Sequence, residues 1–448
     1  MIGMETTRNL FNYIFSKTTA TETQVSLHSE HSYLTRFANS IVHQNVMEKN
    51  TRLIIKSIVG KRIGEAATNS IKRSNVLRTL EQSIDIAKHK KEDPDYHGLP
   101  KPRIYRKATT YFRATQYLSH RKKVNIIHSI TEASKPFTCF GAFTTGISEI
   151  AIGNSNGLFA YNTGTDAIMR LTMKGDNGSS SGQLSHRDIC RMDFNALQND
   201  VFRKTKLSQN PRTDKPGKYT VLLTPEAVSD ILIFLGYLGF NSLLYSEGRS
   251  CLKGKIGRKI FHRKFTLVDN PFDKRGFSFP FDFEGVPKKK LTLVDNGVVK
   301  TLVYDRTTAY KMGKRSTGHC IETGMGPIPY HLVIKKGTET VASMIAGIKS
   351  GIAINTFHYV NVVEPRRLVL TGMTRNGTYL IENGHIAYAL KNLRFNQSIL
   401  EAFNNILSIS TEMRFVEGGN TYGARFPWGS VLPYITIAGF NFSGTTEF

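Results

Sequence analysis

The chain is poor in cysteine, and it lacks long apolar runs. Its four cysteines, Cys139, Cys190, Cys251 and Cys320, lie far apart in 448 residues and form no CxxC pair. This spacing excludes a dense disulfide framework and is typical of reduced thiols. The longest apolar stretch, residues 231–240, is about half of the roughly 20 residues that a membrane helix requires. The first residues also lack the basic start and apolar core of a secretory signal. We therefore expect a cytoplasmic protein without a membrane segment.

Common catalytic motifs are missing as well. The sequence has no GxSxG nucleophile motif, no GxGxxG loop and no Walker phosphate loop. Its histidines are dispersed, and the compact pairs are His28 with His31 and His319 with Cys320. If the chain is extended at these positions, the two side chains of each pair point to opposite faces of the strand. This favours hydrogen-bonded or surface histidines, with His319 and Cys320 kept as candidate metal ligands because they follow a turn-like STG segment.

Acidic residues are few relative to basic ones. Lysine and arginine number 60 against 35 aspartates and glutamates, a net charge of +25. Such a charge can attract nucleic acid or anionic lipid. The basic groups are nevertheless short and scattered, and no finger, homeodomain or RNA-recognition signature accompanies them. We interpret the charge as spread over solvated surface, and a basic nucleic-acid-binding protein stays an alternative.

Turn signals and alternating apolar residues predict an α+β fold with mainly antiparallel sheets. Asn296-Gly297 and Asn383-Gly384 each interrupt an alternating apolar run, which is the strongest short signal for a hairpin. There is no regular alternation of strands with long helices. We predict a mixed αβ domain over residues 1–212 and a domain rich in antiparallel sheet over residues 213–448.

Local patterns also predict where individual elements lie. We expect strands with glycine-rich turns over residues 121–183 and a short buried strand over residues 219–223. In the first half, helices are expected over residues 5–15, after Ser74 as the cap, and over residues 185–205. In the second half, one helix is expected to start near Ser229 and another to cover residues 338–350, with Thr338 as its cap. A last helix is expected after Asn396 as the cap, with Leu407 directed inward.

Several longer segments, in a fixed order, are similar to those of a known family. They are TRFANSIVHQN (35–45), GKRIGEAATN (60–69), FEGVP (283–287), VDNGVV (294–299), YDRTTA (304–309), STGH (316–319), GTYLIENGHI (377–386) and KNLRFNQSIL (391–400). With these segments spread over nearly its whole length, the chain resembles the TldD/PmbA family, also called the modulator-of-DNA-gyrase or peptidase U62 family.

The resemblance implies a two-domain TldD/PmbA-like fold and an intracellular proteolytic system of two related subunits. TldD-type subunits are zinc metalloproteases whose helix carries an HExxxH motif, and a cysteine near the C-terminus completes the ligand set. PmbA-type subunits, also called TldE, share the fold, lack the motif and pair with a TldD-type partner. The gyrase name does not imply binding to gyrase or DNA.

Aligned on the segment YTVLLTPEAV (219–228), the motif's histidine positions fall on Ile233 and Leu238 and its glutamate position on Phe234. A shift of one or two residues changes nothing, because no histidine, glutamate or aspartate lies between Asp230 and Glu247. No cysteine follows Cys320. A zinc hydrolase needs a polarised water and a general base. We therefore expect no catalytic residue here, but a packed, dry helix without an ion.

The main hypothesis is a PmbA/TldE-like, non-catalytic pseudo-protease subunit of a TldD-type metalloprotease complex. It has no cofactor of its own, the zinc being expected in a TldD-type catalytic subunit that forms a heterodimer with it; a homodimer is the other arrangement. We expect it to help hold an extended peptide as a strand added to a sheet edge. The alternative enzyme is a metallopeptidase with a relocated metal site, built from His319, Cys320, His331 or His358.

Overall fold

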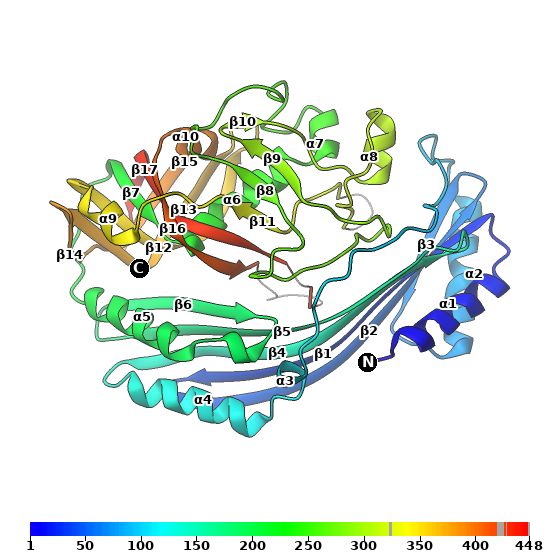
Figure 1. Cartoon of the computed structure of the whole chain (residues 1–448), viewed down its shortest axis with the longest axis horizontal. Helices are drawn as coiled ribbons and strands as arrows, with labels where there is room; N and C mark the ends of the chain where they lie inside the picture. The colour runs from blue at the N-terminus through cyan, green and yellow to red at the C-terminus, as the bar shows by residue number, and fades with distance from the viewer. Residues whose placement is uncertain (322–324, 419–424, 427, 447–448) are drawn as a thin grey trace.

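The computed structural model describes residues 1–321, 325–418, 425–426 and 428–446, which form two sheets with helices packed around them (Figure 1). One sheet is built from residues 22–186 and the other from residues 217–445. Helices combined with extensive antiparallel pairing confirm the α+β class. Within the described residues, no helix combines the length and apolar character needed to cross a bilayer.

The first sheet has six long strands in the order β3-β2-β1-β4-β5-β6, and every pairing in it is antiparallel. The strands are β1 (Glu22–Ala38), β2 (Ile41–Val59), β3 (Arg62–Thr68), β4 (Thr138–Asn154), β5 (Phe159–Lys174) and β6 (Ser179–His186). A tight turn joins β1 to β2, where Asn39 and Ser40 take positive φ (51° and 62°). Residues 69–137, which contain three helices, connect β3 to β4.

Helices cover this sheet at its two ends (Figure 1). They are α1 (Met4–Lys17), α2 (Arg73–His89), α3 (Arg113–Gln116), α4 (His120–Ala133), the 3₁₀ turn η1 (Ile189–Arg191) and α5 (Phe194–Leu207). Near α1 and α2, Phe11 and Leu80 pack with strand residues such as Leu27. At the other end, Ile127 of α4 and Val201 of α5 belong to a separate apolar cluster.

The second sheet has 11 strands among the described residues, with the main order β10-β9-β8-β11-β17-β15-β13-β12-β7. Its strands are β7 (Gly217–Leu223), β8 (Leu267–Asp269), β9 (Leu291–Asp295), β10 (Val298–Val299), β11 (Leu332–Ile334), β12 (Ser350–Glu364), β13 (Val369–Glu382), β14 (His385–Ala389), β15 (Leu393–Ser398), β16 (Ile406–Glu417) and β17 (Gly429–Thr445). Strand β7 pairs with both β12 and β17, so β17, β15, β13, β12 and β7 form a closed circuit.

Both predicted Asn-Gly hairpins are confirmed. Asn296 and Gly297 have φ of 48° and 83° between β9 and β10, and Asn383 and Gly384 have φ of 50° and 80° between β13 and β14. In the part of the second half that the structure describes, five helices accompany this sheet: α6 (Pro225–Gly239), α7 (Ser242–Ser246), α8 (Arg306–Lys311), α9 (Val341–Ala346) and α10 (Ile399–Asn404). The largest apolar cluster of the protein lies between α6 and this sheet.

Three predictions in the first half are wrong in part. Residues 120–133 form α4 rather than strand, because Ser119 caps a helix by accepting from Lys122 N at 3.3 Å and Ile127 and Ile130 are buried at helical spacing. The helix expected over 185–205 starts only at Phe194, where Asp193 is the cap. Ser74 is not the cap of α2, because the helix begins at Arg73 and Lys72 occupies the cap position, without a side-chain capping hydrogen bond.

Two helix starts in the second half also differ from the prediction. Thr340, not Thr338, caps α9, and Ser350 already belongs to β12 because it pairs with Glu382. Asn396 lies in β15, and Ser398 caps α10. Leu407 therefore lies outside the helix, in β16, where it is 48% exposed.

Polar contacts join the two sheets into one body. The Arg425 guanidinium lies 2.6 Å from the Asp166 carboxylate of β5, and both side chains are buried. Asn355 of β12 donates to the carbonyl of Ser181 on β6 at 2.9 Å. These contacts therefore hold the first sheet in a fixed position relative to the second sheet and to the residues around α6.

Candidate functional site

Helix α6 begins where β7 ends, and Thr224 defines its start. The Thr224 hydroxyl accepts from Ala227 N at 3.3 Å and donates to the carbonyl of Asn355 on β12 at 2.5 Å. Pro225 follows at the first helical position and Glu226 in the first turn, where a carboxylate is favourable. The helix thus starts at Pro225 rather than near Ser229 as predicted, and its first turn is attached to the sheet.

The two faces of α6 have different surroundings. Val228, Ile231 and Leu235 are buried in the core of the second sheet. The opposite face carries residues at positions i, i+4, i+7 and i+11, which share one side of a helix. These residues line a cavity of about 830 Å³: Glu226, Asp230, Ile233 and Tyr237.

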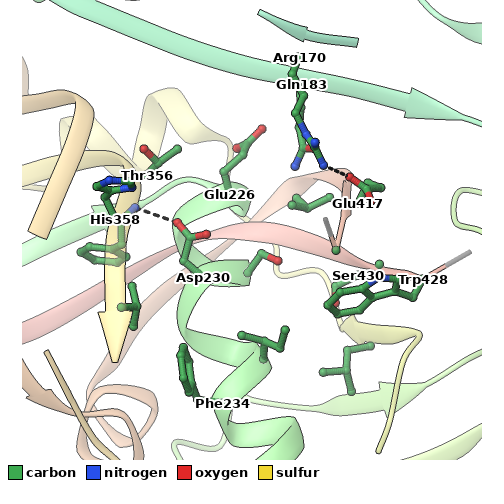
Figure 2. A pocket seen from close by; sticks show the side chains of 18 of the residues that line it. Arg170, Gln183, Glu226, Asp230, Phe234, Thr356, His358, Glu417, Trp428 and Ser430 are labelled. Carbon is green, nitrogen blue, oxygen red and sulfur yellow. Dashed lines mark hydrogen bonds and ion pairs between the residues drawn. The ribbon is translucent and has the colours of Figure 1, made fainter. Parts of the chain in front are cut away.

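The cavity lies between the two sheets (Figure 2). Its walls come from β5 and β6 on one side, and from α6, β12 and the β16–β17 region on the other. Aromatic rings make up much of the lining: Phe234, Tyr237, Tyr330, Phe357, Tyr359 and Trp428. A concave, largely apolar cavity with a few polar groups is the usual form of a ligand site.

Asp230 is a polar group on the α6 side of this cavity. Its carboxylate accepts from the backbone nitrogen of Phe357 at 2.8 Å. Burial, with a smaller contribution from the neighbouring Glu226, raises the pKa of Asp230 to about 7. The carboxyl therefore exchanges its proton near neutral pH.

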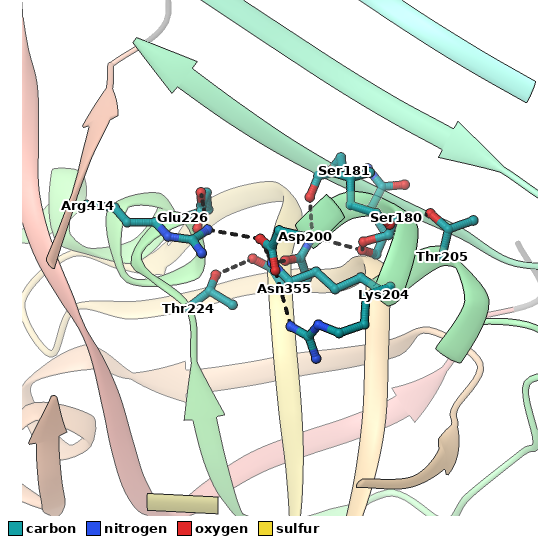
Figure 3. A network of polar contacts seen from close by, with 12 residues as sticks. Ser180, Ser181, Asp200, Lys204, Thr205, Thr224, Glu226, Asn355 and Arg414 are labelled. Atoms are coloured by element: carbon teal, nitrogen blue, oxygen red, sulfur yellow. Dashed lines mark hydrogen bonds and ion pairs between the residues drawn. The ribbon is translucent and has the colours of Figure 1, made fainter. Parts of the chain in front are cut away.

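Glu226 lies one turn before Asp230, and it is 8% exposed. One of its oxygens is 4.0 Å from Nη1 of Arg414, but the same Nη1 is closer to Asp200, at 3.1 Å. Lys204 also binds Asp200, at 2.9 Å (Figure 3). The other oxygen, Oε2, is buried and has no hydrogen-bond partner among the described residues. Glu226 is thus a carboxylate with an unused acceptor beside the cavity.

A third carboxylate lies across the cavity. Glu417 of β16 is fully buried at its side chain and pairs with the Arg170 guanidinium of β5 (Figure 2). This pair joins the two walls. His358 of β12 also lines the cavity, and burial, with a smaller effect from Arg375, lowers its pKa. His358 is therefore neutral at neutral pH.

The structure separates the three residues aligned with the zinc motif. Ile233 and Phe234 line the large cavity, and Ile233 is 39% exposed. Leu238 instead lines a smaller pocket with Leu244 and Glu364. Five residues along a helix correspond to a rotation of about 140° beyond a full turn, which explains the separation. The expected packed, dry site is therefore wrong for Ile233.

These three positions do not fit a metal. Isoleucine, phenylalanine and leucine side chains have no donor atom for zinc. Across the described part of the chain, no group of three histidine, cysteine, aspartate or glutamate side chains is arranged to bind a metal ion. No catalytic step through a metal can be derived for this chain from these residues.

Of the other metal candidates, His319, Cys320 and His331 lie outside the lining of the large cavity, whereas His358 is part of it. His319 has Nδ1 2.9 Å from the Thr317 hydroxyl and Nε2 3.2 Å from Asp269, and both His319 and Asp269 are fully buried. Next to it, burial raises the pKa of the Cys320 thiol well above its usual value. The structure does not bring His319, Cys320, His331 and His358 together as a ligand set.

Sequence reasoning missed the two carboxylates of α6. Glu226 and Asp230 are four residues apart, directly before the apolar run of the helix. This i, i+4 spacing would have placed both on one face, but a helix start near Ser229 put Glu226 outside the helix. The Arg170–Glu417 pair joins residues 247 positions apart, and no local pattern predicts such a pair.

The chain matches the model of the PmbA/TldA metallopeptidase C-terminal domain over residues 216–444. It also shares its fold with the crystal structure of TldE from Thermococcus kodakarensis. The TM-score is 0.86 with 22% sequence identity, covering 98% of this chain and 100% of that chain.

Curated relatives agree with this match. A metalloprotease of Methanothermobacter thermautotrophicus is 26% identical over 51% of this chain and 51% of its own length, so this chain spans about half the length of such relatives. The metalloprotease PmbA of Escherichia coli O157:H7 is 22% identical over 84% of this chain and 83% of its own length. The chain belongs to the PmbA/TldD metallopeptidase family.

Proposed function

We propose that this chain is the PmbA/TldE-like, non-catalytic subunit of a TldD-type zinc metalloprotease complex in the cell interior. The observation that carries the proposal is the composition of α6. At the positions of the family's zinc motif it has Ile233, Phe234 and Leu238, which have neither metal ligands nor a general base. The zinc and the hydrolysis would then belong to the partner subunit.

The role left to this chain is to bind peptide. The cavity beside α6 holds about 830 Å³ and combines aromatic walls with carboxylates, which supports this role. Strand β12 borders it, and the pairing of β12 with β7 runs only from Gly351 to Ile354. An extended peptide would lie along the part of β12 beyond Phe357, with its side chains directed into the cavity.

Purification of the chain alone and together with a TldD-type partner tests the proposal. Peptide cleavage and stoichiometric zinc should appear only when the partner is present. Size-exclusion chromatography of the mixture should show a complex, and a partner variant without its motif glutamate provides the inactive control. If the two chains never associate, the subunit role is wrong.

A further inference from the structure

Acidic side chains are concentrated in the large cavity, although the chain as a whole is strongly basic. Lysine and arginine outnumber aspartate and glutamate by 60 to 35 in the sequence. Among the described residues that line the cavity, the charged ones show the opposite balance, with Glu226, Asp230 and Glu417 against Arg170. Arg170 pairs with Glu417, and Arg414, which is outside the lining, is 4.0 Å from Glu226. The two carboxylates of α6 are therefore the acidic groups that a ligand meets in the described lining.

Glu226 has an acceptor atom that the described protein groups leave unused. The residue is 8% exposed, and its Oε2 is buried without a hydrogen-bond partner among the described residues. Arg414 contacts the other oxygen only at 4.0 Å, while it binds Asp200 at 3.1 Å. A buried carboxylate oxygen without a donor is costly, and a donor from a ligand removes that cost.

Asp230 lies one turn further along the same face of α6 (Figure 2). Its contact with Phe357 N uses Oδ2, and a carboxylate oxygen can accept more than one hydrogen bond. Two carboxylates at i and i+4 can accept from a single cation placed between them. An ammonium group has three donors and no acceptor, so it matches this arrangement.

The remaining walls also favour a cation. Faces of tryptophan, tyrosine and phenylalanine rings attract ammonium groups, and the cavity lining includes Phe357 and Trp428. An anion would meet the α6 carboxylates without a free guanidinium in the described lining, since Arg170 is paired. A neutral ligand would leave Oε2 of Glu226 with no strong donor.

We propose that the cavity binds a primary ammonium group of a peptide between Glu226 and Asp230, an inference that rests on the peptide-binding role proposed above. The ammonium group is either a lysine side chain or a peptide amino terminus. Substrates with such a group at this position would be selected by this chain rather than by the catalytic partner.

Isothermal titration calorimetry on the full chain with short alanine-based peptides tests this inference. One peptide is acetylated and carries a central lysine, a second has norleucine in place of the lysine, and a third is the norleucine peptide with a free amino terminus. The lysine or the free-amine peptide should bind about tenfold or more tightly than the acetylated norleucine peptide. The arm that shows the gain identifies the source of the ammonium group.

Matched variants locate the effect. Asp230→Asn keeps an acceptor for Phe357 N, and Glu226→Gln keeps the side-chain size. In each variant, the ratio of the affinities for the peptides with and without the ammonium group should fall to near unity. Glu382→Gln, an exposed position outside the cavity lining, should leave it intact. Three results would overturn the inference. The charged and uncharged peptides could bind equally well, both cavity variants could retain the preference for the ammonium group, or no peptide could bind. The subunit role is judged separately, by cleavage with the partner.

Discussion

The Asp230 carboxylate accepts a hydrogen bond from the backbone nitrogen of Phe357 at 2.8 Å and so connects α6 to β12 at the cavity wall. Strand β7 has ended by this point, since its pairing with β12 stops at Ile354. The side chain therefore takes the place of a neighbouring strand as acceptor for Phe357 N. Asp230 contributes both to the fold and to the proposed peptide site.

Replacing Asp230 by asparagine should change how stability depends on pH. In the folded protein, burial and Glu226 raise the pKa of Asp230 to about 7 from the ordinary 3.8. The folded state thus binds this proton more tightly than the unfolded chain, and the resulting stability is lost as the pH rises from 3.8 through about 7. Asp230→Asn keeps the acceptor for Phe357 N and does not titrate. Relative to the parent, the free energy of unfolding of this variant should increase by on the order of 1–3 kcal/mol between about pH 4 and pH 8. This range is smaller than the full pKa shift would give, because the carboxyl faces the open cavity.

Urea denaturation of both proteins at the two pH values measures this change. Glu382→Gln, an exposed substitution, is the control and should show no comparable change with pH. An Asp230→Asn effect of the same size at both pH values would contradict the assigned pKa.

The buried Asp269–His319 pair should be important for stability. Although burial alone would raise the pKa of Asp269, His319 and, to a lesser degree, Lys288 hold it well below its usual value. This carboxylate therefore contributes stability above its ordinary pKa of 3.8, and that stability is lost as the pH falls below it. Because burial lowers the pKa of His319, its imidazole is neutral near neutral pH. Asp269→Asn should therefore cost about 1–3 kcal/mol there, the effect of losing a buried hydrogen-bond acceptor.

The measurement is the free energy of unfolding at neutral pH and at about pH 3. The difference between Asp269→Asn and the parent should shrink at the lower pH. A variant as stable as the parent at neutral pH would show that the pair does not stabilise the fold.

Restoring the zinc motif should not restore a zinc site. In the variant Ile233→His, Phe234→Glu, Leu238→His, the two histidines would start from positions that line different pockets. No cysteine after Cys320 is available as a third ligand. Elemental analysis after dialysis should find no stoichiometric zinc in the triple variant. One bound zinc per chain would contradict the side-chain directions described for α6.

The chain's only tryptophan offers a direct report of ligand entry. Trp428 lines the cavity, so a bound peptide changes the surroundings of its ring. Intrinsic fluorescence should shift in intensity or wavelength and saturate at the concentrations found by calorimetry. A peptide that binds by calorimetry without any change in emission would have to bind elsewhere, and the cavity assignment would then be wrong.

Local signals predicted part of the fold correctly. The Asn296-Gly297 and Asn383-Gly384 hairpins were predictable because their turn geometry requires positive φ at both residues. Helix starts were less predictable, since several polar residues compete for the cap. Thr224 and Ser229 both precede the apolar run, and the contact of Thr224 with Asn355 on β12 favours the earlier start.

The cavity was less predictable than the elements around it. The apolar character of residues 231–240 indicated burial, but α6 has only one side in the core. Its other side faces the first sheet, whose position depends on contacts between distant residues such as Asp166 and Arg425. The exposure of Ile233 follows from that packing and from no pattern within the helix.

The most direct test of the central claim measures peptide hydrolysis and bound zinc in three samples. The samples are this chain alone, a TldD-type partner alone and the two together. The account predicts no zinc-dependent cleavage by this chain alone, and cleavage in the mixture that requires only the partner's motif residues. Zinc-dependent cleavage by the purified chain in the absence of a partner would contradict it.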